Sequence, residues 1–509
     1  TCIQDAVVRG ALASRVMRTL PERQSMTLVP DRITVDGSGD ADEVGILIDG
    51  AIRPGMGPEQ KLVSRSDGRV LAVVRSAGAE DVRIAYDIAA QAAPSWAAAG
   101  PAARAEVLHR AADLFRERAG ELAPIISADM GKPASEANVE VAKGAAVLDY
   151  YAELGYRRLG TTYRTDFDED IFTIVEPLGV VALITPWNFP FTIPIRKLSA
   201  ALAAGNAVVF KPSTNAGITG LMIAVTLLDA GLPPGLVQAM IGRSSVIEKA
   251  LLSAPELDGV SLTGSYEAAV AIRSRLRMEV PFQAELGGKN TIVVWADADL
   301  SKAADIIVAS SFRNNGQICT AAGRLLVHTA VYDDLLETLS DRVRAMTDAS
   351  GPDELGIMVS DGEAARVEEY VSLADDEARD VVRPEPGGWR EGRVAPAVLV
   401  DPDTGPLTTE EIFGPVVTFE AISGIDEAIA MANATAYGLT SGIVTGDVAV
   451  ARRFWKGSHA GTVKVNSPLT GVPFHVPFEG YGHSGAGWAE GGESSLEFFT
   501  RTKTVYLRS

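Results

Sequence analysis

Cys319 is one of only two cysteines in the 509-residue chain, and its neighbours leave room for a reactive thiol. It lies in the segment Asn314-Asn315-Gly316-Gln317-Ile318-Cys319-Thr320-Ala321, which is rich in small, flexible and amide-bearing residues. A thiolate in such a segment could attack an electrophilic carbon. A single cysteine can also be an inert, small hydrophobic residue of the core, and the segment alone leaves both interpretations open.

Two other segments present polar side chains where a ligand could reach them. Asn188 lies in Thr185-Pro186-Trp187-Asn188-Phe189-Pro190, directly after an apolar run, and the two prolines favour an extended turn. Glu285 is followed by Gly287 and Gly288, which would allow the backbone to approach a ligand closely. Each segment could instead be a simple turn, with Asn188 bonded to its own backbone and Glu285 in solvent.

Short apolar runs alternate with segments of helical length, and this alternation must position the three segments. The runs are 180–184, 207–210, 237–241, 259–262 and 291–295, separated by helical segments 194–204, 216–230, 245–253 and 266–277. Continuous helical periodicity over residues 79–156 comes before them. Strands that are apolar throughout and alternate with helices predict a parallel sheet covered on both faces, so the fold class is doubly wound α/β.

A second alternation predicts a second α/β domain from about residue 288 to residue 475. Its helical segments are 302–312, 331–346 and 425–433, and its strands are 324–328, 416–419, 441–444 and 462–465. The charged segment Asp375 to Arg393 is predicted to be a surface loop. Because ligands of such sheets bind at the carboxyl ends of the strands, Asn188 is well placed to contact one.

Charge and cysteine content limit the classes of partner and compartment. With 46 Lys and Arg against 66 Asp and Glu, the formal charge of −20 disfavours nucleic acid and anionic membranes. Two cysteines cannot form a disulfide framework, so we expect a reducing, cytoplasmic compartment. No apolar run reaches the ~18 residues of a transmembrane helix. Residues 1–45 are interpreted as an N-terminal extension whose arginines faintly resemble a transit peptide, although a flexible tail is the simpler interpretation.

Together the three segments resemble the aldehyde dehydrogenase superfamily, in the family's order and close to its spacing, over residues 47–505. Further matching segments are Lys211-Pro212-Ser213, Leu262-Thr263-Gly264-Ser265, Glu410-Glu411-Ile412-Phe413-Gly414-Pro415, Pro477-Phe478 and Ser484-Gly485. Gly480-Tyr481-Gly482-His483-Ser484-Gly485 also matches the G-x-G-x-x-G pattern, but it follows no clear strand and is not assigned to a dinucleotide.

The resemblance implies a domain plan with a small β oligomerisation element. The NAD(P)-binding domain would comprise 46–155 and 178–287, the catalytic domain 288–475, the oligomerisation element 156–177 and 495–509, and a C-terminal anchor-loop segment 476–494. We expect a homodimer or homotetramer, because Thr502 to Leu507 has the alternation of an edge strand that needs a partner.

The resemblance also implies residue roles. Cys319 would be the nucleophile, the Asn188 amide and the Cys319 backbone N–H would hold the oxyanion, and Glu285 would be the general base that hydrolyses the thioester. The implied cofactor-binding residues are Trp187, Lys211, Ser213, Thr214, Gly264, Ser265, Leu286, Glu411 and Phe413. No metal is implied.

Thr214 stands where many NAD-dependent members of the family have Glu. A Glu would repel a 2′-phosphate, whereas Thr offers a hydrogen-bond donor and Lys211 supplies positive charge. The sequence therefore favours NADP over NAD, with NAD binding retained as the alternative.

Two arginines point to the substrate. Arg196 and Arg313 match positions at which succinate-semialdehyde dehydrogenases look similar and bind a distal carboxylate, and an Arg pair suits a carboxylate. A short ω-carboxy semialdehyde such as succinate semialdehyde is therefore expected. Phe474 and His475 could instead shape a pocket for an aromatic or other uncharged aldehyde, and each arginine could be a structural ion pair.

Two further alternatives concern the reaction itself. In an acyl-coenzyme A-forming member a thiol, and not water, takes the acyl group, and such members usually lack the base that Glu285 would supply. A catalytically silent structural relative is the other alternative, and the intact Cys319, Glu285 and Asn188 argue against it.

Overall fold

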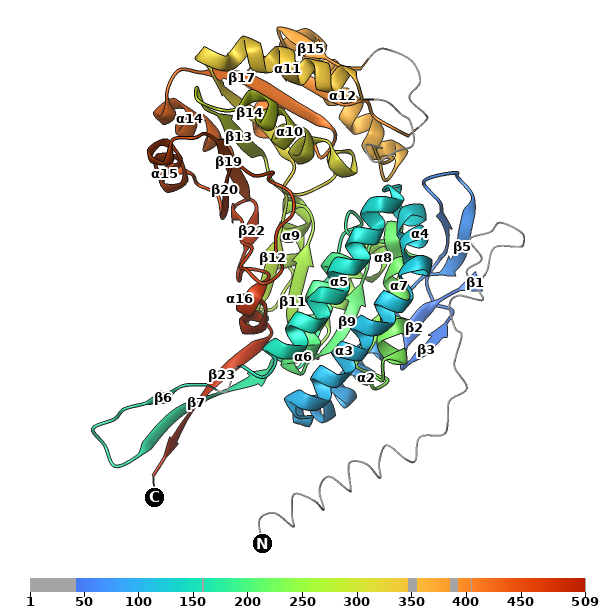
Figure 1. Ribbon diagram of the computed structural model, residues 1–509. Helices are drawn as coiled ribbons and strands as arrows, with labels where there is room; N and C mark the ends of the chain where they lie inside the picture. Colours follow the sequence, from blue (N-terminus) through green and yellow to red (C-terminus); the bar gives the residue numbers. More distant parts are fainter. Residues whose placement is uncertain (1–42, 158–159, 347–354, 385–391, 404, 509) are drawn as a thin grey trace.

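The computed structural model describes residues 43–157, 160–346, 355–384, 392–403 and 405–508. Two layered α/β units and a projecting β-arm make up this part of the chain (Figure 1). The N-terminal extension expected over residues 1–45 lies outside these ranges except for residues 43–45. Within the described ranges, no helix combines the length and apolar character needed to cross a membrane.

The first unit is built on an eight-stranded sheet. In spatial order its strands are β22 (Gly485–Ala486), β12 (Phe282–Glu285), β11 (Leu257–Thr263), β8 (Val180–Ile184), β9 (Ala207–Lys211), β10 (Val237–Ala239), β2 (Ile46–Ile48) and β3 (Ala51–Arg53). The strands from β12 to β10 pair in parallel, and β22 and β2 join them in antiparallel. Because the chain runs outward from β8 in both directions, β8 and β11 form a topological switch point, where α/β sheets bind ligands.

Helices cover both faces of this sheet. The chain passes from β8 to β10 through α6 (Thr192–Ala204) and α7 (Gly217–Asp229), and returns to β12 through α8 (Ser244–Ser253) and α9 (Tyr266–Arg273). Because such crossovers are right-handed, the two helix pairs lie on opposite faces. The N-terminal helices α2 (Ala79–Ala98), α3 (Pro101–Glu117), α4 (Ala119–Met130) and α5 (Ala134–Leu154) add to these layers.

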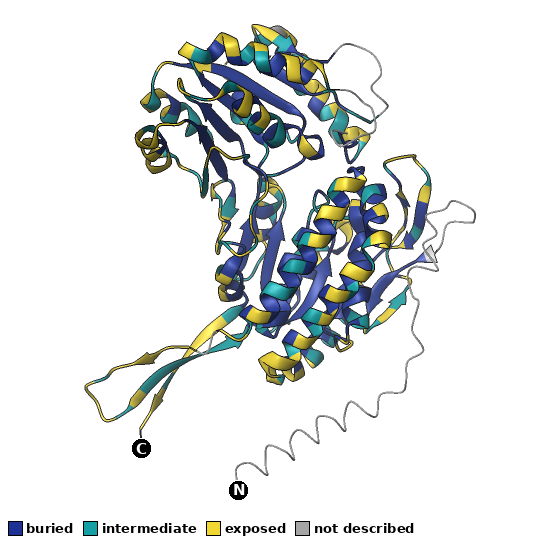
Figure 2. Cartoon of the chain, viewed as in Figure 1, coloured by how far each residue is buried: buried dark blue, intermediate teal, exposed yellow. Residues whose placement is uncertain are grey.

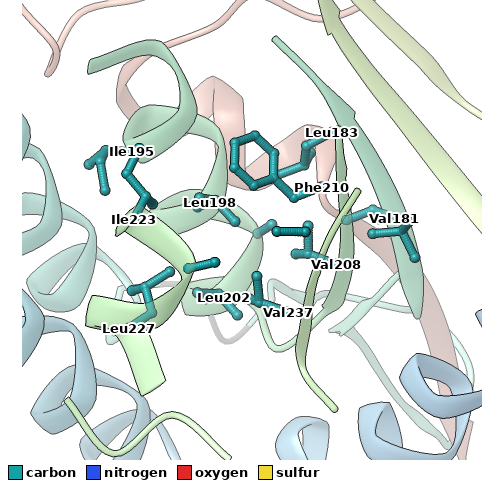
Figure 3. Packing of buried hydrophobic residues seen from close by; sticks show 14 of the residues in the cluster. Val181, Leu183, Ile195, Leu198, Leu202, Val208, Phe210, Ile223, Leu227 and Val237 are labelled. Atoms are coloured by element: carbon teal, nitrogen blue, oxygen red, sulfur yellow. The ribbon is translucent and has the colours of Figure 1, made fainter. Parts of the chain in front are cut away.

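The core under α6 and α7 explains why the strands are continuous apolar runs. In Figure 3 the strand residues Val181, Leu183, Val208, Phe210 and Val237 lie with the helix residues Ile195, Leu198, Leu202, Ile223 and Leu227, all fully buried. Both faces of the strands are covered, so most side chains on either face are apolar, as in other parallel sheets. Figure 2 shows that the strands of the central sheet are buried in the second unit as well as in the first.

The second unit contains a seven-stranded sheet. Its order is β15 (Asp380–Val382), β16 (Ala397–Val400), β17 (Val416–Ile422), β14 (Ala322–His328), β13 (Asn290–Val294), β19 (Thr440–Val444) and β20 (Thr462–Val465). Only β15 is antiparallel to its neighbour. Its helices are α10 (Leu300–Ser311), α11 (Tyr332–Arg344), α12 (Asp361–Glu377), α13 (Pro406–Thr409), α14 (Ile425–Ala432) and α15 (Val448–Gly457).

The arm consists of β6 (Thr162–Tyr163), β7 (Asp170–Pro177) and β23 (Thr500–Leu507). β23 pairs with β7 along its whole length, from Thr500 with Pro177 to Leu507 with Asp170. The arm extends away from both units, and much of its surface is exposed (Figure 2). Tyr506 and Leu507 near its tip are 65% and 56% exposed, which is unusual for large apolar side chains.

Shorter elements complete the described chain. β1 (Glu43–Val44), β5 (Val70–Arg75) and β4 (Glu59–Val63) form a small sheet, and β18 (Tyr437–Gly438) pairs with β21 (Tyr481–Gly482). The single-turn helices are η1 (Thr214–Ala216), η2 (Arg313–Gly316) and η3 (Thr329–Val331), and α16 (Gly492–Phe498) precedes the arm.

The sequence-based prediction of the elements missed or misplaced several of them, among which three bear on the fold. β12 was not predicted, because Gln283 and Glu285 interrupt its apolar character. The run at 291–295, grouped with the strands of the first sheet, forms β13 of the second sheet. The predicted loop at 375–393 contains the end of α12 and the edge strand β15, while its residues 385–391 lie outside the described ranges.

Candidate active site

The three sequence segments come together at one cavity of about 730 Å³. Its lining includes nine of the residues predicted from the sequence: Trp187, Asn188, Gly264, Ser265, Glu285, Leu286, Cys319, Glu411 and Phe413. The loops after β8 and β11 and the end of β12 supply one side, and the turn before β14 and the loop after α13 supply the other. The cavity thus lies between the two units, at the switch point of the first sheet.

A left-handed backbone turn carries Cys319. Asn314, Asn315 and Gly316 follow one another with φ values of 48°, 55° and 70°. Asn tolerates this region better than most residues, and at Gly316 a Cβ would lie 2.0 Å from the carbonyl oxygen of Gly414, so only glycine fits. The Asn290 amide donates to the carbonyls of Cys319 and Ala321, both at 2.8 Å, and fixes the turn.

Asn188 is bonded to the same turn. Its buried side chain donates from Nδ2 to the carbonyl oxygen of Gln317 at 3.1 Å, and its Oδ1 accepts the backbone N–H of Phe189 at 3.1 Å. A primary amide has two N–H donors, so one remains for a bound oxygen. The buried Lys132 donates to the Asn188 carbonyl at 3.0 Å and holds the backbone from the other side.

Glu285 faces the thiol. It is 5% exposed, and its Oε1 makes no hydrogen bond among the described residues. Burial raises the pKa of Glu285 to about 8, and the nearby Glu490 carboxylate adds to this while Lys197 opposes it. Burial, the Glu285 charge and a hydrogen bond to Glu285 hold the pKa of Cys319 well above its usual range. The pair therefore rests as a thiol and a partly protonated carboxyl.

A buried cluster of charged residues, Glu490, Lys197 and Arg196, acts electrostatically on Glu285. Glu490 accepts a hydrogen bond from Lys197 and another from the Thr263 hydroxyl at 3.2 Å. Lys197 also donates to the Ser261 hydroxyl at 2.8 Å, and Arg196 Nη1 lies 3.9 Å from Glu490 Oε2. Buried charges held in such a network keep fixed positions, because breaking one pair would leave an uncompensated charge.

Three of the predicted cofactor-binding residues, Glu411, Phe413 and Trp187, line the cavity together. Glu411 accepts the backbone N–H of Gly288 at 2.8 Å, and burial raises the pKa of Glu411 to about 7. A Cβ on Gly287 would lie 2.0 Å from Glu411 Oε2, so glycine is required for this approach. The Phe413 ring, on a backbone with φ of 54°, lies edge-on to Trp187 with centroids 5.7 Å apart.

Other predicted cofactor-binding residues lie at or just after the ends of neighbouring strands. Lys211 ends β9 and is buried, and burial lowers the pKa of Lys211 to about 8. Thr214 donates to the Gly242 carbonyl at 3.3 Å, and Ser213 caps η1 through a bond from the Asn215 N–H. Ser265 caps α9 by accepting the Ala268 N–H at 3.2 Å. Lys211, Ser213 and Thr214 are not among the residues that line the 730 Å³ cavity.

These residues fit a dinucleotide. The cavity is large enough for the nicotinamide half, and the start of α9 offers backbone N–H groups next to Gly264 for a pyrophosphate. Trp187 and Phe413 offer aromatic surface, and the required glycine at 287 leaves the backbone open beside Glu411.

The four predicted substrate residues lie outside the lining of the cavity that holds Cys319, Glu285 and Asn188. Arg196 is 8% exposed, its Nε has no partner among the described residues, and its charge acts on the Cys319 thiol. Arg313 has a half-exposed side chain and pairs with Glu136 at 3.5 Å, as the alternative of a structural ion pair predicts. Phe474 packs on Tyr150 with centroids 5.5 Å apart, and His475 is exposed. None of the four lines the 730 Å³ cavity.

The glycine-rich segment 480–485 is part of the site, although its G-x-G-x-x-G pattern was not assigned to a dinucleotide. Gly485 of β22 pairs with Glu285 of β12, and Leu286 donates to the Ser484 carbonyl at 3.0 Å. His483 lines the cavity and stacks on Tyr266 with centroids 3.6 Å apart. A Cβ on Gly485 would lie 2.7 Å from the Gly480 carbonyl oxygen, so the glycine spacing serves close packing.

Comparisons with known proteins agree with this geometry. A profile of the aldehyde dehydrogenase family matches residues 53–505. The chain is 38% identical over 459 residues to an alpha-ketoglutarate semialdehyde dehydrogenase of Haloferax volcanii, covering 86% of this chain and 93% of that one. It is 35% identical over 466 residues to a 2,5-dioxopentanoate dehydrogenase of Saccharolobus solfataricus, covering 89% and 97%. An aldehyde dehydrogenase structure from Brucella melitensis biovar abortus superposes with a TM-score of 0.86 at 30% identity, covering 91% and 97%.

Proposed function

The chain belongs to the aldehyde dehydrogenase family and oxidises aldehydes, and we propose that its substrate is a short semialdehyde with a distal carboxylate, of the α-ketoglutarate semialdehyde type. The observation that carries this proposal is the unpaired Nε of Arg196, a buried cation that acts on the Cys319 thiol. The two relatives above bear the names of enzymes for this aldehyde. Succinate semialdehyde, the example expected from the sequence, shares the carboxylate but lacks the 2-oxo group.

The proposed reaction begins with a proton transfer from Cys319. Because burial raises the pKa of Glu285 to about 8, its ionised form is a stronger base than an ordinary carboxylate and can accept the thiol proton as sulfur attacks the aldehyde carbon. The aldehyde oxygen then carries negative charge. The second N–H of the Asn188 amide and the backbone N–H of Cys319 are the proposed donors to it.

Bound NAD(P)⁺ supplies the hydride acceptor. The residues proposed to hold it are Trp187, Lys211, Ser213, Thr214, Gly264, Ser265, Leu286, Glu411 and Phe413. After oxidation the acyl group remains on the Cys319 sulfur as a thioester. Glu285, whose Oε1 is free of protein partners among the described residues, releases the thiol proton to solvent and then, ionised again, activates the water that releases the acid.

NADP is the proposed physiological cofactor, within a family that uses NAD(P). Two features of the chain support this preference. Thr214 carries no charge that would repel a 2′-phosphate, and its hydroxyl lies in a loop contact with Gly242. The Lys211 ammonium forms no ion pair with any of the described residues, so its charge is available to the phosphate.

We also propose an oligomeric state and a cellular compartment for the protein. The exposed Tyr506 and Leu507 at the end of the long strand β23 support pairing of the arm with a second subunit, as a homodimer or homotetramer. A reducing cytoplasm is proposed as the compartment, because a single thiol at the site must stay reduced to attack an aldehyde.

A steady-state assay tests the proposed function. Purified protein is mixed with NAD⁺ or NADP⁺ and with α-ketoglutarate semialdehyde, succinate semialdehyde or butanal, and reduced cofactor is followed by absorbance. We expect the highest kcat/KM with α-ketoglutarate semialdehyde and no dependence on coenzyme A. A preference for butanal would refute the substrate, and a lack of turnover with any aldehyde would point to the catalytically silent alternative.

A further inference from the structure

A half-buried cation, Lys143, was not among the site residues predicted from the sequence. Lys143 is in the middle of α5, half-buried, and its ammonium donates to the carbonyl oxygen of Val472 at 2.9 Å. The next residue, Gly144, packs so closely on Phe191 that a Cβ there would lie 2.3 Å from the ring. Helix α5 is thereby held against the start of α6, the helix that carries Arg196.

Lys143 belongs to a cluster of three cations, Lys143, Arg196 and Lys464. The charges of Arg196 and Lys464 lower the pKa of Lys143, and a thiolate at Cys319 would raise it. Lys464 of β20 donates to the carbonyls of Pro468 and Thr470 at 3.0 and 2.8 Å, in the same loop that Lys143 contacts. The cluster therefore lies near the reactive sulfur and along the loop that precedes Phe474.

The three cations of the cluster have few carboxylate partners. Among the described residues, neither Lys143 nor Lys464 has a carboxylate within ion-pair distance, and Arg196 has only Glu490 at 3.9 Å, which Lys197 already engages. Gathering like charges in a half-buried place is unfavourable unless a counter-ion joins them. The missing partner is an anion next to Cys319.

The donors that remain match a particular anion. An ammonium has three N–H donors, and Val472 takes one of those of Lys143. The Arg196 Nε donor is also unused. A 2-oxocarboxylate presents a carboxylate and an adjacent carbonyl oxygen in one plane, which needs two converging donor groups, whereas a simple carboxylate is satisfied by one guanidinium.

We propose that Lys143 is a specificity-determining residue that, with Arg196, binds the distal 2-oxocarboxylate of the substrate through the donors that Val472 leaves free. This inference rests on the proposed function. It places the second substrate-binding cation, beside Arg196, on α5. Arg313 pairs with Glu136 on the half-exposed side of the turn and leaves that position to Lys143. Neither α5 nor β20 contributes to the 730 Å³ cavity, so the substrate tail and the cofactor use different walls around Cys319.

The charge of Lys143 gives the binding a pH dependence. Burial lowers the pKa of Lys143 to about 8, Arg196 and Lys464 lower it as well, and Glu140 and Cys319 oppose them. These are the charged groups that face Lys143 from α6, β20, its own helix and the turn before β14. The ammonium is present below that pKa and lost above it, so the preference for anionic aldehydes must fall as pH rises through about 8.

Three variants test the proposal on the intact enzyme. Lys143→Met removes the charge and keeps the length, Lys143→Arg keeps the charge at high pH, and Lys302→Met is the matched control. Lys302 is 77% exposed on α10 and pairs only with Asp299 among the described residues, so its loss changes net charge equally without touching the cluster. Circular dichroism and titration of Cys319 with a thiol reagent verify folding.

The expected result is a change in selectivity. In Lys143→Met, kcat/KM for α-ketoglutarate semialdehyde falls about 10- to 100-fold relative to that for butanal, as loss of a charge-assisted hydrogen bond predicts. Lys143→Arg keeps the wild-type selectivity and holds it above pH 8, and Lys302→Met matches the wild type. An equal loss for both aldehydes would overturn the proposal, because a mere tether for Val472 affects every substrate alike.

A second measurement separates this inference from the proposed function. The reaction product 2-oxoglutarate is titrated calorimetrically into Cys319→Ala protein with and without Lys143→Met, and glutarate is the comparison ligand. We expect Lys143→Met to weaken the binding of 2-oxoglutarate more than the binding of glutarate. If wild-type enzyme prefers the semialdehyde but Lys143→Met binds both acids as before, the inference fails and the proposed function stands. If the wild type shows no aldehyde turnover, the function itself fails.

Discussion

Glu285 and Gly485 lie opposite each other in the antiparallel pair of β12 and β22, so a two-residue strand from the C-terminal segment positions the carboxylate that faces Cys319. The pairing is tight, since a Cβ on Gly485 would lie 2.7 Å from the Gly480 carbonyl oxygen and 3.3 Å from that of Ala284. The Glu285 carboxyl, the proposed base, is therefore positioned by residues two hundred positions away in the sequence.

Gly485→Ala should move Glu285 away from its place without removing it. We expect hydride transfer to survive as a pre-steady-state burst while thioester hydrolysis slows by about 10-fold or more, since a base that is 1 Å out of place loses much of its effect. Gly100→Ala is the control, because nothing lies within 4 Å of a Cβ at that site. Loss of burst and turnover together would instead indicate a general folding defect.

The pH profile should report the Glu285 carboxyl. A general base works when ionised, and the pKa of Glu285 is raised to about 8, so the acylation rate should increase as pH rises toward 8 and then level off. Alkylation of Cys319 by iodoacetamide in the absence of cofactor should follow the same rise. In Glu285→Gln this step should disappear, leaving only the rise from the thiol itself at higher pH. An unchanged profile would remove Glu285 from the proton transfer.

Asn188→Ala tests the oxyanion donor. The amide is anchored to the Gln317 carbonyl at 3.1 Å and keeps one N–H free. Removing such a donor should lower kcat by roughly 10²- to 10³-fold with little change in KM. Cofactor binding, followed by fluorescence of the reduced form, serves as the control and should be retained. A rise in KM with an unchanged kcat would mean that Asn188 binds the substrate and does not stabilise the transition state.

Thr214→Glu tests the cofactor preference. A carboxylate beside the proposed 2′-phosphate site should raise KM for NADP⁺ by about 10-fold or more, because like charges at close range repel. NAD⁺ should be used as well as before or better. Thr214→Ser retains the hydroxyl that bonds Gly242 and should behave as wild type. Equal effects on both cofactors would argue against a phosphate at this position.

The sequence predicts those parts of the fold that have local patterns. β8, β9 and α6 were found within two residues of their ends, because strands buried on both faces are continuously apolar and the helices between them have regular spacing. β12 escaped detection because it carries Gln283 and Glu285, which serve the buried network and the site. Its partner β22 has two residues and no pattern at all.

The candidate site shows the same division. Cys319, Asn188 and Glu285 stand in segments whose composition marks them, and all three line one cavity. Lys143 has no such mark, since it is one lysine on an Ala-rich helix. The packing of Gly144 on Phe191 and the hydrogen bonds from Phe191 and Thr192 to Glu140 bring α5 toward the helix of Arg196, and such contacts between distant segments have no signature in a single sequence.

Trapping the acyl-enzyme tests the central claim, that Cys319 is the nucleophile of an aldehyde oxidation completed by Glu285. Glu285→Gln protein is incubated with NADP⁺ and α-ketoglutarate semialdehyde, quenched in acid, and digested for mass spectrometry. We predict one equivalent of reduced cofactor and a 2-oxoglutaryl thioester on the peptide that contains Cys319, absent from Cys319→Ala protein. Reduced cofactor formed without an adduct on Cys319, or an adduct on any other residue, would contradict the account.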